Sequence, residues 1–325
     1  MAKITMVEAI AMAHGWEMQH DSNVVVIGQD VGANGGVFRA TAGLQERFGK
    51  DRVQDTPLAE ATIAGMSVGM ATHGLKPVAE IQFMGFLYPA LDQIVNHMSR
   101  MRNRTRGRLS CPVVMRMPHG GGIHAPEHHS ESTETLLCHI PGIRVVCPSS
   151  PVRAYGLLLA AIRDPDPVMF LEPVRLYRAM RQEVTDDGQA LPLDVCFTLR
   201  EGCDVTIVTW GAMTSETLRA AVELDKRGTS AEVIDLATLS PIDIETILAS
   251  VAKTGRLVIV HEAARNVGVG AEIAALVAEH SLYDLLAPIR RVTGFDTIMP
   301  LFKLEHDYIP SVQRIIDAVE LTFAD

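Results

Sequence analysis

The chain has 325 residues, of which 47% are hydrophobic and 21% are charged, and its formal net charge at pH 7 is −10. This length favours two domains over one, and the composition is that of a globular protein rather than a disordered one. The acidic balance argues against general nucleic-acid binding, which needs a basic surface, and it suits a basic protein partner. No apolar run is long enough to span a bilayer.

The N-terminal segment MAKITMVEAIAMAHG contains Glu8 and His14 where a secretory signal peptide needs an unbroken apolar core. We therefore expect no targeting segment and a cytoplasmic protein. The five cysteines are odd in number and form no CxxC pair, so we expect reduced, small core residues and no structural zinc site built on them. They are Cys111, Cys138, Cys147, Cys196 and Cys203.

Helical and apolar segments alternate in the first half of the chain. A helix is predicted over residues 5–20, where Thr5 and Glu8 have the spacing of a capping box. Further helical patterns cover residues 57–74, 89–105 and 150–164. Short apolar runs that are typical of buried parallel strands cover residues 24–28, 76–83, 111–118, 144–150 and 167–173. This alternation predicts an α/β domain with a mostly parallel sheet.

The alternation breaks at about residues 181–203, a polar segment with Gly and Pro that we interpret as an interdomain connection with room for one hairpin. We therefore predict a first α/β domain over residues 1–185 and a smaller α/β domain over residues 186–325. In the second domain, strands are predicted over 204–211, 231–239 and 256–263, and helices over 215–228, 243–255 and 269–280.

The segment MPHGGGIHAPEHHSESTETLL, residues 117–137, follows a predicted strand, and ligands of such sheets bind at the carboxyl ends of the strands. Its glycines lack the spacing of dinucleotide and P-loop motifs, which favours a flexible loop over a phosphate site. His124 and His128 are four residues apart, as in helical zinc sites, but Pro126 separates them and no third ligand is evident. A loop histidine can instead serve as a general acid or base. The residues alone leave these alternatives open.

Glu60, in DTPLAEATIAG, is a separate candidate. It lies at the start of a helix so rich in Ala and Gly that another element could pack very close to it. A glutamate in this position is either a solvated residue of the helix N-terminus or a buried carboxylate with a specific partner, because burying an unpaired charge is expensive.

Seven motifs, taken in order, resemble the beta subunit of the thiamine diphosphate-dependent decarboxylating component of 2-oxo acid dehydrogenase complexes. They are GQDVGANGGVFRAT, DTPLAEATIAG, EIQFMGFLYPALDQI, GGGIHAPEHHSES, HIPGIRVVCPSSP, GLLLAAIRDPDPVMFLEPVRLYR and DLATLSPIDIETI. The resemblance covers essentially the whole chain and is most like bacterial pyruvate dehydrogenase beta subunits, with branched-chain 2-oxo acid and acetoin enzymes as close relatives. It implies a pyrimidine-binding α/β domain followed by a transketolase-type C-terminal domain.

The resemblance implies roles for individual residues. The Glu60 carboxylate would bond a ring nitrogen of thiamine diphosphate and favour the imino tautomer that activates the cofactor, with Phe86 beside the pyrimidine. His129 would move a proton when the acyl group passes to lipoamide, and His128 and His124 would lie at the rim of the substrate pocket. Gln29 stands where many relatives have Glu, which argues against an acid relay at this position.

The resemblance also implies partners and ions. The GDG motif of the diphosphate and Mg²⁺ site is absent, so an alpha subunit would supply that site in an α2β2 heterotetramer. The peripheral-subunit-binding domain of a lipoyl acyltransferase core would dock on the acidic surface. A structural potassium ion would be held largely by backbone carbonyls, at positions where Asp166 replaces a frequent Asn. These positions are Val113, Ala161, Ile162, Asp164 and Asp166.

We therefore expect an enzyme subunit that, with its alpha chain, decarboxylates pyruvate and acetylates lipoyl groups. A branched-chain 2-oxo acid or acetoin enzyme is the near alternative. A docking subunit with an inactive pocket and a zinc hydrolase using His124 and His128 are the alternatives from other classes.

Overall fold

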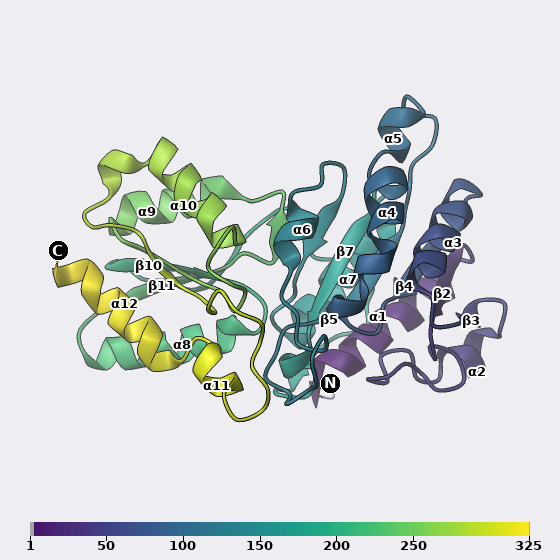
Figure 1. The fold of residues 1–325 in the computed structure, drawn as a ribbon, viewed down its shortest axis with the longest axis horizontal. Coiled ribbons are helices and arrows are strands. Elements are labelled where there is room, and N and C mark those ends of the chain that lie inside the picture. The colour runs from purple at the N-terminus through teal and green to yellow at the C-terminus, as the bar shows by residue number, and fades with distance from the viewer. Residues whose placement is uncertain (1–2, 325) are drawn as a thin grey trace. The chain divides into compact units, whose positions relative to one another are not determined.

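The computed structural model describes residues 3–324, and the chain forms two compact units (Figure 1). The first unit comprises Met1–His119 and Leu136–Leu193, and the second comprises Gly120–Thr135 and Asp194–Asp325. The glycine- and histidine-rich loop therefore packs with the second unit, although the strands on both sides of it in sequence belong to the first. The predicted α/β class is confirmed, because each unit has a sheet that is mainly parallel and is covered by helices.

The first unit is built on a parallel sheet in the order β6-β7-β5-β4-β2-β3. All residues of β2, β5 and β7 are buried, as expected for strands that are covered on both faces. The strands are β2 Val24–Gly28, β3 Val53–Asp55, β4 Lys76–Glu80, β5 Val114–His119, β6 Arg144–Val146 and β7 Val168–Pro173.

The helices of the first unit begin at recognisable caps. At α1 (Met6–His20) the predicted capping box is confirmed, since Glu8 N–H donates to the Thr5 hydroxyl and Thr5 N–H donates to the Glu8 carboxylate. Helix α7 (Pro151–Arg163) has Ser150 as its cap and packs against α1, while α3 (Glu60–Thr72) packs on β4. The shorter elements are α2 Leu44–Phe48, η1 Met84–Phe86, η2 Tyr88–Ala90, α4 Leu91–Gln93, η3 Ile94–Met98, α5 Met101–Arg104 and η4 Val174–Leu176, and α6 Glu134–Cys138 lies where the chain returns from the second unit.

The prediction of one helix over residues 89–105 is wrong. Ser99 N–H donates to the carbonyl of Ile94, five residues back, which is the pattern of a π-helical turn. The helical path is broken after this turn and resumes in α5. The hydrophobic spacing did not reveal the break, because a single π turn shifts the apolar face without removing it.

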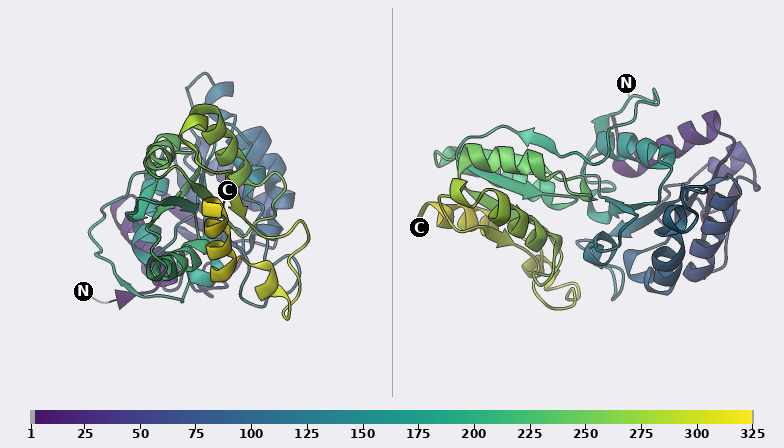
Figure 2. Two further views of the ribbon diagram at one scale, coloured as in Figure 1. Left: turned by 90° about the vertical axis from the view of Figure 1, so that its left-hand side faces the viewer. Right: turned by 90° about the horizontal axis from the view of Figure 1, so that it is seen from above.

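The second unit has a sheet in the order β14-β13-β10-β11-β9, parallel except for β9. Helices α9 and α10 lie on one face of this sheet and α8 and α12 on the other (Figures 1 and 2). The elements are β9 Phe197–Arg200, β10 Val205–Thr209, α8 Met213–Lys226, β11 Ala231–Asp235, β12 Thr238–Ser240, α9 Ile244–Thr254, β13 Leu257–Val260, α10 Val269–His280, η5 Leu282–Asp284, β14 Arg290–Val292, α11 Glu305–Tyr308 and α12 Val312–Ala324.

The connection between the two halves differs from its prediction, because it contains no hairpin among the described residues. Strand β8 (Gln182–Glu183) pairs with β1 (Lys3–Ile4), and β9 pairs antiparallel with β11. Strands β8 and β1 form a separate two-stranded sheet, whereas β9 is the edge strand of the sheet of the second unit. The longest helix described, α1, has 15 residues, and none of the described helices combines the length and hydropathy required to cross a bilayer.

A buried ionic cluster joins the three central strands of the first unit. Arg116 on β5 donates through Nε and Nη2 to both oxygens of Glu172 on β7, at 2.6 and 2.9 Å, and through Nη1 to Glu80 on β4 at 2.9 Å. The Tyr177 hydroxyl also donates to Glu172. Arg116 is 1% exposed and Glu172 is fully buried. Burial raises the pKa of Glu80, and Glu172 adds to this against the opposing charge of Arg116.

We predict that Arg116→Met lowers the free energy of unfolding of the first unit by about 3–5 kcal/mol, because it leaves two buried carboxylates without their cation. The chain has two tryptophans, and Trp16 lies in the first unit while Trp210 lies in the second. In a Trp210→Phe background, urea unfolding followed by Trp16 fluorescence therefore reports on the first unit.

The matched control is Arg102→Met, since Arg102 pairs with Asp166 at 2.7 Å but is about half exposed. Its loss should cost no more than about 1 kcal/mol. Equal effects of the two substitutions would contradict the importance assigned to the buried cluster.

Candidate functional site

Glu60 is the first residue of α3 and is half-buried. No hydrogen bond or ion pair joins its carboxylate to any other residue that the structure describes in this chain. The carboxylate thus stands at a helix N-terminus, where the helix dipole favours a negative charge, with its acceptor capacity available to a ligand.

The outer face of α3 is open in this chain. Ala61 and Gly69 are exposed, and a Cβ added to Gly69 would meet no atom within 4 Å. Leu58, just before the helix, is 69% exposed. The chain's own packing therefore does not require the small residues on this face, which suits the close approach of a second chain.

Phe86 lies in the turn η1, which follows the carboxyl end of β4. Its ring meets that of Phe83 at a centroid distance of 5.6 Å, and Phe38 contacts both Phe83 and Tyr177 at 5.5 and 5.0 Å. The two contacts of Phe83 are edge-to-face and that of Phe38 with Tyr177 is tilted, and such contacts fix ring positions. The structure thus places Glu60 and Phe86 in the same unit, with Phe86 at the rim of an aromatic cluster.

The loop of residues 120–135 leaves the carboxyl end of β5 and packs within the second unit. Gly121 N–H donates to Glu262 at 2.9 Å, and Gly122 and His124 N–H groups donate to Glu305 at 2.6 and 3.1 Å. A Cβ on Gly120 would lie 2.0 Å from Glu262 Oε1. The glycines therefore have a more specific role than flexibility, because they let two carboxylates reach the backbone.

The loop histidines have different environments. His124 has φ +56° and its Nε2 lies 3.6 Å from Glu305, while its ring is 5.4 Å from that of His306. His128 is exposed, with φ +68° and Nδ1 3.9 Å from Glu131. A small hollow beside the loop is lined by His128, Pro126 and Ser130 together with residues 298–301.

His129 is half-buried, and its Nδ1 lies 2.9 Å from the carbonyl oxygen of Glu127. A carbonyl can only accept, so Nδ1 carries the proton and Nε2 is the unprotonated nitrogen of the neutral imidazole. In this tautomer Nε2 can accept a proton, as a general base at this position must.

The described residues contain no group of three or more His, Cys, Asp or Glu side chains that could hold a metal ion. The zinc alternative thus finds no third ligand beside His124 and His128 in the described part of the chain. The positions implied for potassium lie where α7 ends and the chain turns toward β7, beside the start of β5. The Asp164 and Asp166 carboxylates are engaged by Arg144 and Arg102, so their backbone carbonyls would be the ligands.

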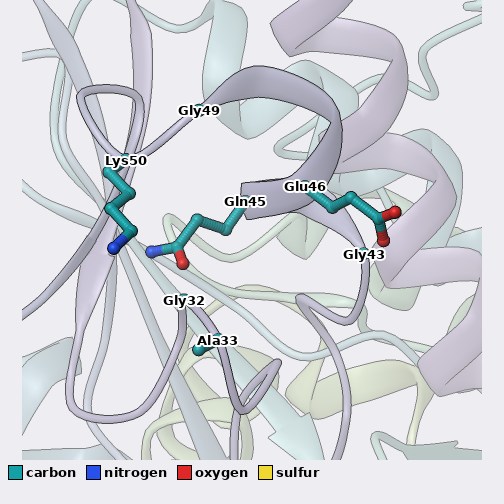
Figure 3. Close-up of a pocket in the computed structure, with 7 residues that line it drawn as sticks. All are labelled: Gly32, Ala33, Gly43, Gln45, Glu46, Gly49 and Lys50. Carbon is teal, nitrogen blue, oxygen red and sulfur yellow. The ribbon is translucent and has the colours of Figure 1, made fainter.

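A surface hollow in the first unit holds none of the predicted site residues (Figure 3). It is lined by Gly32, Gln45, Lys50 and neighbouring glycines, and the Gln45 amide donates to the carbonyl of Val53. Lys50 and Gln45 extend toward Gly32 in this view. The hydrogen bond from Gln45 to Val53 stabilises the turn before β3. We assign the hollow no catalytic role.

The sequence reasoning missed a buried histidine in the second unit. His261 follows β13 and is fully buried, with its ring stacked on Trp210 at 5.0 Å. A Cβ on Gly270 would lie 2.8 Å from His261 Nε2, so the helix start packs directly on the ring. Burial lowers the pKa of His261 to about 4, with Glu134 opposing and Arg291 adding to the effect.

The carboxylates that hold the loop were also missed. Glu262 follows the apolar run LVIV and is 4% exposed, and Glu305 begins α11 and is 2% exposed. A glutamate two residues after a buried parallel strand is a weak signal for a group at the functional edge of a sheet. Nothing near Glu305 in sequence marks that residue.

Comparisons with known proteins agree with this architecture. Residues 2–180 match the family model "Transketolase, pyrimidine binding domain", and residues 196–315 match "Transketolase, C-terminal domain". A solved structure described as "Split gene transketolase, inactive beta4 tetramer" superposes with a TM-score of 0.80 over 99% of each chain at 24% identity, which shows the fold. The predicted transketolase-type fold of both domains is thus confirmed.

Curated relatives match over nearly their whole length. The pyruvate dehydrogenase E1 component subunit beta of Bacillus subtilis (strain 168) is 49% identical over 98% of both chains. The protein of the same name from Acholeplasma laidlawii is 50% identical over 97% of this chain and 96% of its own.

The buried His261 predicts a pH-dependent stability of the second unit. Its pKa is lowered in the folded state, so its contribution is complete above the unfolded pKa of about 6.5 and is lost as the pH falls toward about 4. In a Trp16→Phe background, the free energy of unfolding followed by Trp210 fluorescence should fall between these pH values by up to about 3 kcal/mol more than in a His261→Gln variant. Parallel pH profiles for the two proteins would contradict this.

Proposed function

This chain belongs to the family of pyruvate dehydrogenase E1 component beta subunits, and we propose that it acts with an alpha subunit to decarboxylate pyruvate and to acetylate lipoyl groups reductively. The two relatives described above are both pyruvate dehydrogenase subunits, which favours pyruvate over branched-chain 2-oxo acids and acetoin. The observation that carries the proposal is the carboxylate of Glu60, which begins α3 and has no partner among the residues that the structure describes.

Glu60 and Phe86 fit the pyrimidine half of thiamine diphosphate. A half-buried carboxylate with free acceptor capacity can bond a protonated ring nitrogen, and an aromatic rim can pack against a flat heterocycle. The cofactor, when bound, supplies the nucleophilic carbon that attacks the 2-oxo group. Glu60 would hold a proton at the ring nitrogen and so favour the imino tautomer, whose imino nitrogen can accept a proton.

His129 is proposed to move the proton that accompanies acyl transfer to lipoamide. Its Nδ1 is oriented by the carbonyl of Glu127, and Nε2 would exchange a proton with the thiol or hydroxyl group that reacts. His128 and His124 are more exposed and are proposed to line the entrance for the substrate.

The alpha subunit is needed because this chain lacks the GDG motif for the diphosphate and Mg²⁺. The open face of α3, with its exposed Ala61 and Gly69, is suited to cover by such a partner in an α2β2 heterotetramer. The net charge of −10 suits docking of a basic peripheral-subunit-binding domain from the lipoyl acyltransferase core.

We extend the proposal to a structural potassium ion near the end of α7. Carbonyls at a helix C-terminus carry partial negative charge, so those of Ala161, Ile162 and Asp164 are ligands of the kind a hard cation needs. The Ala161 carbonyl accepts the Asp164 N–H at 3.3 Å and keeps a second lone pair. The carbonyl of Val113 accepts a hydrogen bond from the Val168 N–H at 2.9 Å. Its second lone pair would coordinate the ion.

For Glu60→Gln in the co-purified heterotetramer, we predict that turnover of pyruvate falls about a hundredfold or more, because the neutral amide no longer favours the protonated ring nitrogen. Turnover is measured with lipoyl domain as acceptor, and cofactor binding is measured separately. Glu46→Gln is the control, since Glu46 is exposed in the first turn of α2. Activity of the Glu60 variant within about twofold of wild type would exclude this role.

For His129→Ala, we predict that lipoyl acetylation falls by about a hundredfold, whereas decarboxylation assayed with an artificial electron acceptor falls far less. The reason is that the proposed proton transfer belongs to the second half-reaction. His128→Ala serves as the control and should affect both half-reactions mildly. Equal losses in both half-reactions of the His129 variant would refute the assignment.

A further inference from the structure

We propose that Glu305 and Glu262 are positioning residues that hold the loop of residues 120–135 and so set the location of His129 during acyl transfer. The inference rests on the proposed function, in which His129 acts on this loop. Both glutamates belong to the second unit, as does the loop itself, and neither is assigned a catalytic contact.

Both carboxylate oxygens of Glu305 accept hydrogen bonds from the backbone of the loop. Oε1 accepts the Gly122 N–H at 2.6 Å, and Oε2 accepts the His124 N–H at 3.1 Å. The side chain is only 2% exposed, so water competes little for these bonds. Hydrogen bonds to a charged acceptor are about twice as strong as neutral ones, and two of them from one carboxylate fix the direction of the backbone.

Glu262 ties the two ends of the loop together. Its Oε1 accepts the Gly121 N–H near the start of the loop and the Ser132 hydroxyl near its end, both at 2.9 Å. Gly120 N–H also donates to the carbonyl of Glu131 at 2.9 Å. The base of the loop is thus closed, and His129 lies between this closure and the Glu305 contact.

The three glycines are what permit this arrangement. A Cβ on Gly120 would fall 2.0 Å from Glu262 Oε1, and one on Gly121 would fall 2.6 Å from the Met299 methyl group and 3.3 Å from Glu305 Oε1. Gly120 and Gly122 also have φ of +84° and +90°, which favours glycine. The glycines of the loop and the two carboxylates, which are distant in sequence, therefore depend on one another to fix the position of the loop.

The test is Glu305→Gln in the assembled enzyme with its alpha subunit. Glutamine keeps one acceptor oxygen but turns an N–H toward the second backbone N–H, so one of the two bonds must be lost. Glu279→Gln is the control, because Glu279 is exposed on α10 of the same unit. Hydrogen exchange is measured on peptides that span residues 120–135, and both half-reactions are assayed.

For Glu305→Gln we expect exchange in the loop to accelerate about tenfold or more, because the bonds that protect these amides are weakened. Lipoyl acetylation should fall roughly 10- to 100-fold, since small displacements of a reacting group have such effects. The KM for the 2-oxo acid and the decarboxylation rate should change less than about threefold. Wild-type exchange and kinetics in this variant would overturn the proposal, as would an equal loss in both half-reactions.

Gly120→Ala tests the same contact from the loop side and covers the case in which Glu305→Gln does not assemble. Its added Cβ displaces Glu262, so it should give the same acceleration of exchange and the same selective loss of acetylation. An unchanged loop in both variants would overturn the proposal. The outcome is distinguishable from failure of the proposed function, because an enzyme inactive on 2-oxo acids as wild type would still show the exchange effect.

Discussion

A positive charge in the interior of a parallel sheet sets the first constraint on this protein. Arg116 lies in the middle of β5 and is 1% exposed, so its charge must be matched where it stands. Glu80 and Glu172 supply the match from the two neighbouring strands. The cluster therefore locks β4, β5 and β7 in one register, and these are strands whose carboxyl ends carry Phe86 and the start of the histidine loop.

The loop of residues 120–135 also depends on buried charges, here the carboxylates of Glu262 and Glu305, which need hydrogen-bond donors. There the donors are backbone N–H groups, and an added Cβ at Gly120 or Gly121 would meet a carboxylate oxygen. The loop belongs to the second unit, whereas Glu60 and Phe86 belong to the first. The groups proposed for cofactor activation and for acyl transfer thus belong to different units.

Local features of this fold could be predicted from the sequence because they depend on neighbours in the chain. Thr5 and Glu8 form a capping box three residues apart, and the strand VVVIG is apolar because it is covered on both faces. Glu60 was found at the start of α3 for the same reason: the small residues that mark the helix follow it directly. The π turn at Ile94–Met98 was missed because it shifts the apolar face of the helix without removing it.

Long-range pairings could not be predicted. Arg116 and its two glutamates lie in three separate apolar runs, and each alone reads as a polar interruption of a strand. Glu305 is 183 residues from Gly122, and no local sequence pattern predicts that these two residues make a contact. The three glycines were visible but were interpreted as flexible, because the atoms that come close to them belong to distant side chains.

We propose that this chain provides one part of an active site that an alpha subunit completes. The most direct measurement is turnover of pyruvate, a branched-chain 2-oxo acid and acetoin by the chain alone, by its alpha subunit alone and by the co-purified pair, with thiamine diphosphate, Mg²⁺ and lipoyl domain. We expect acetylation of the lipoyl domain from pyruvate by the pair and none by either chain alone. Full turnover by one chain alone, or a pair that is inactive with pyruvate, would contradict it.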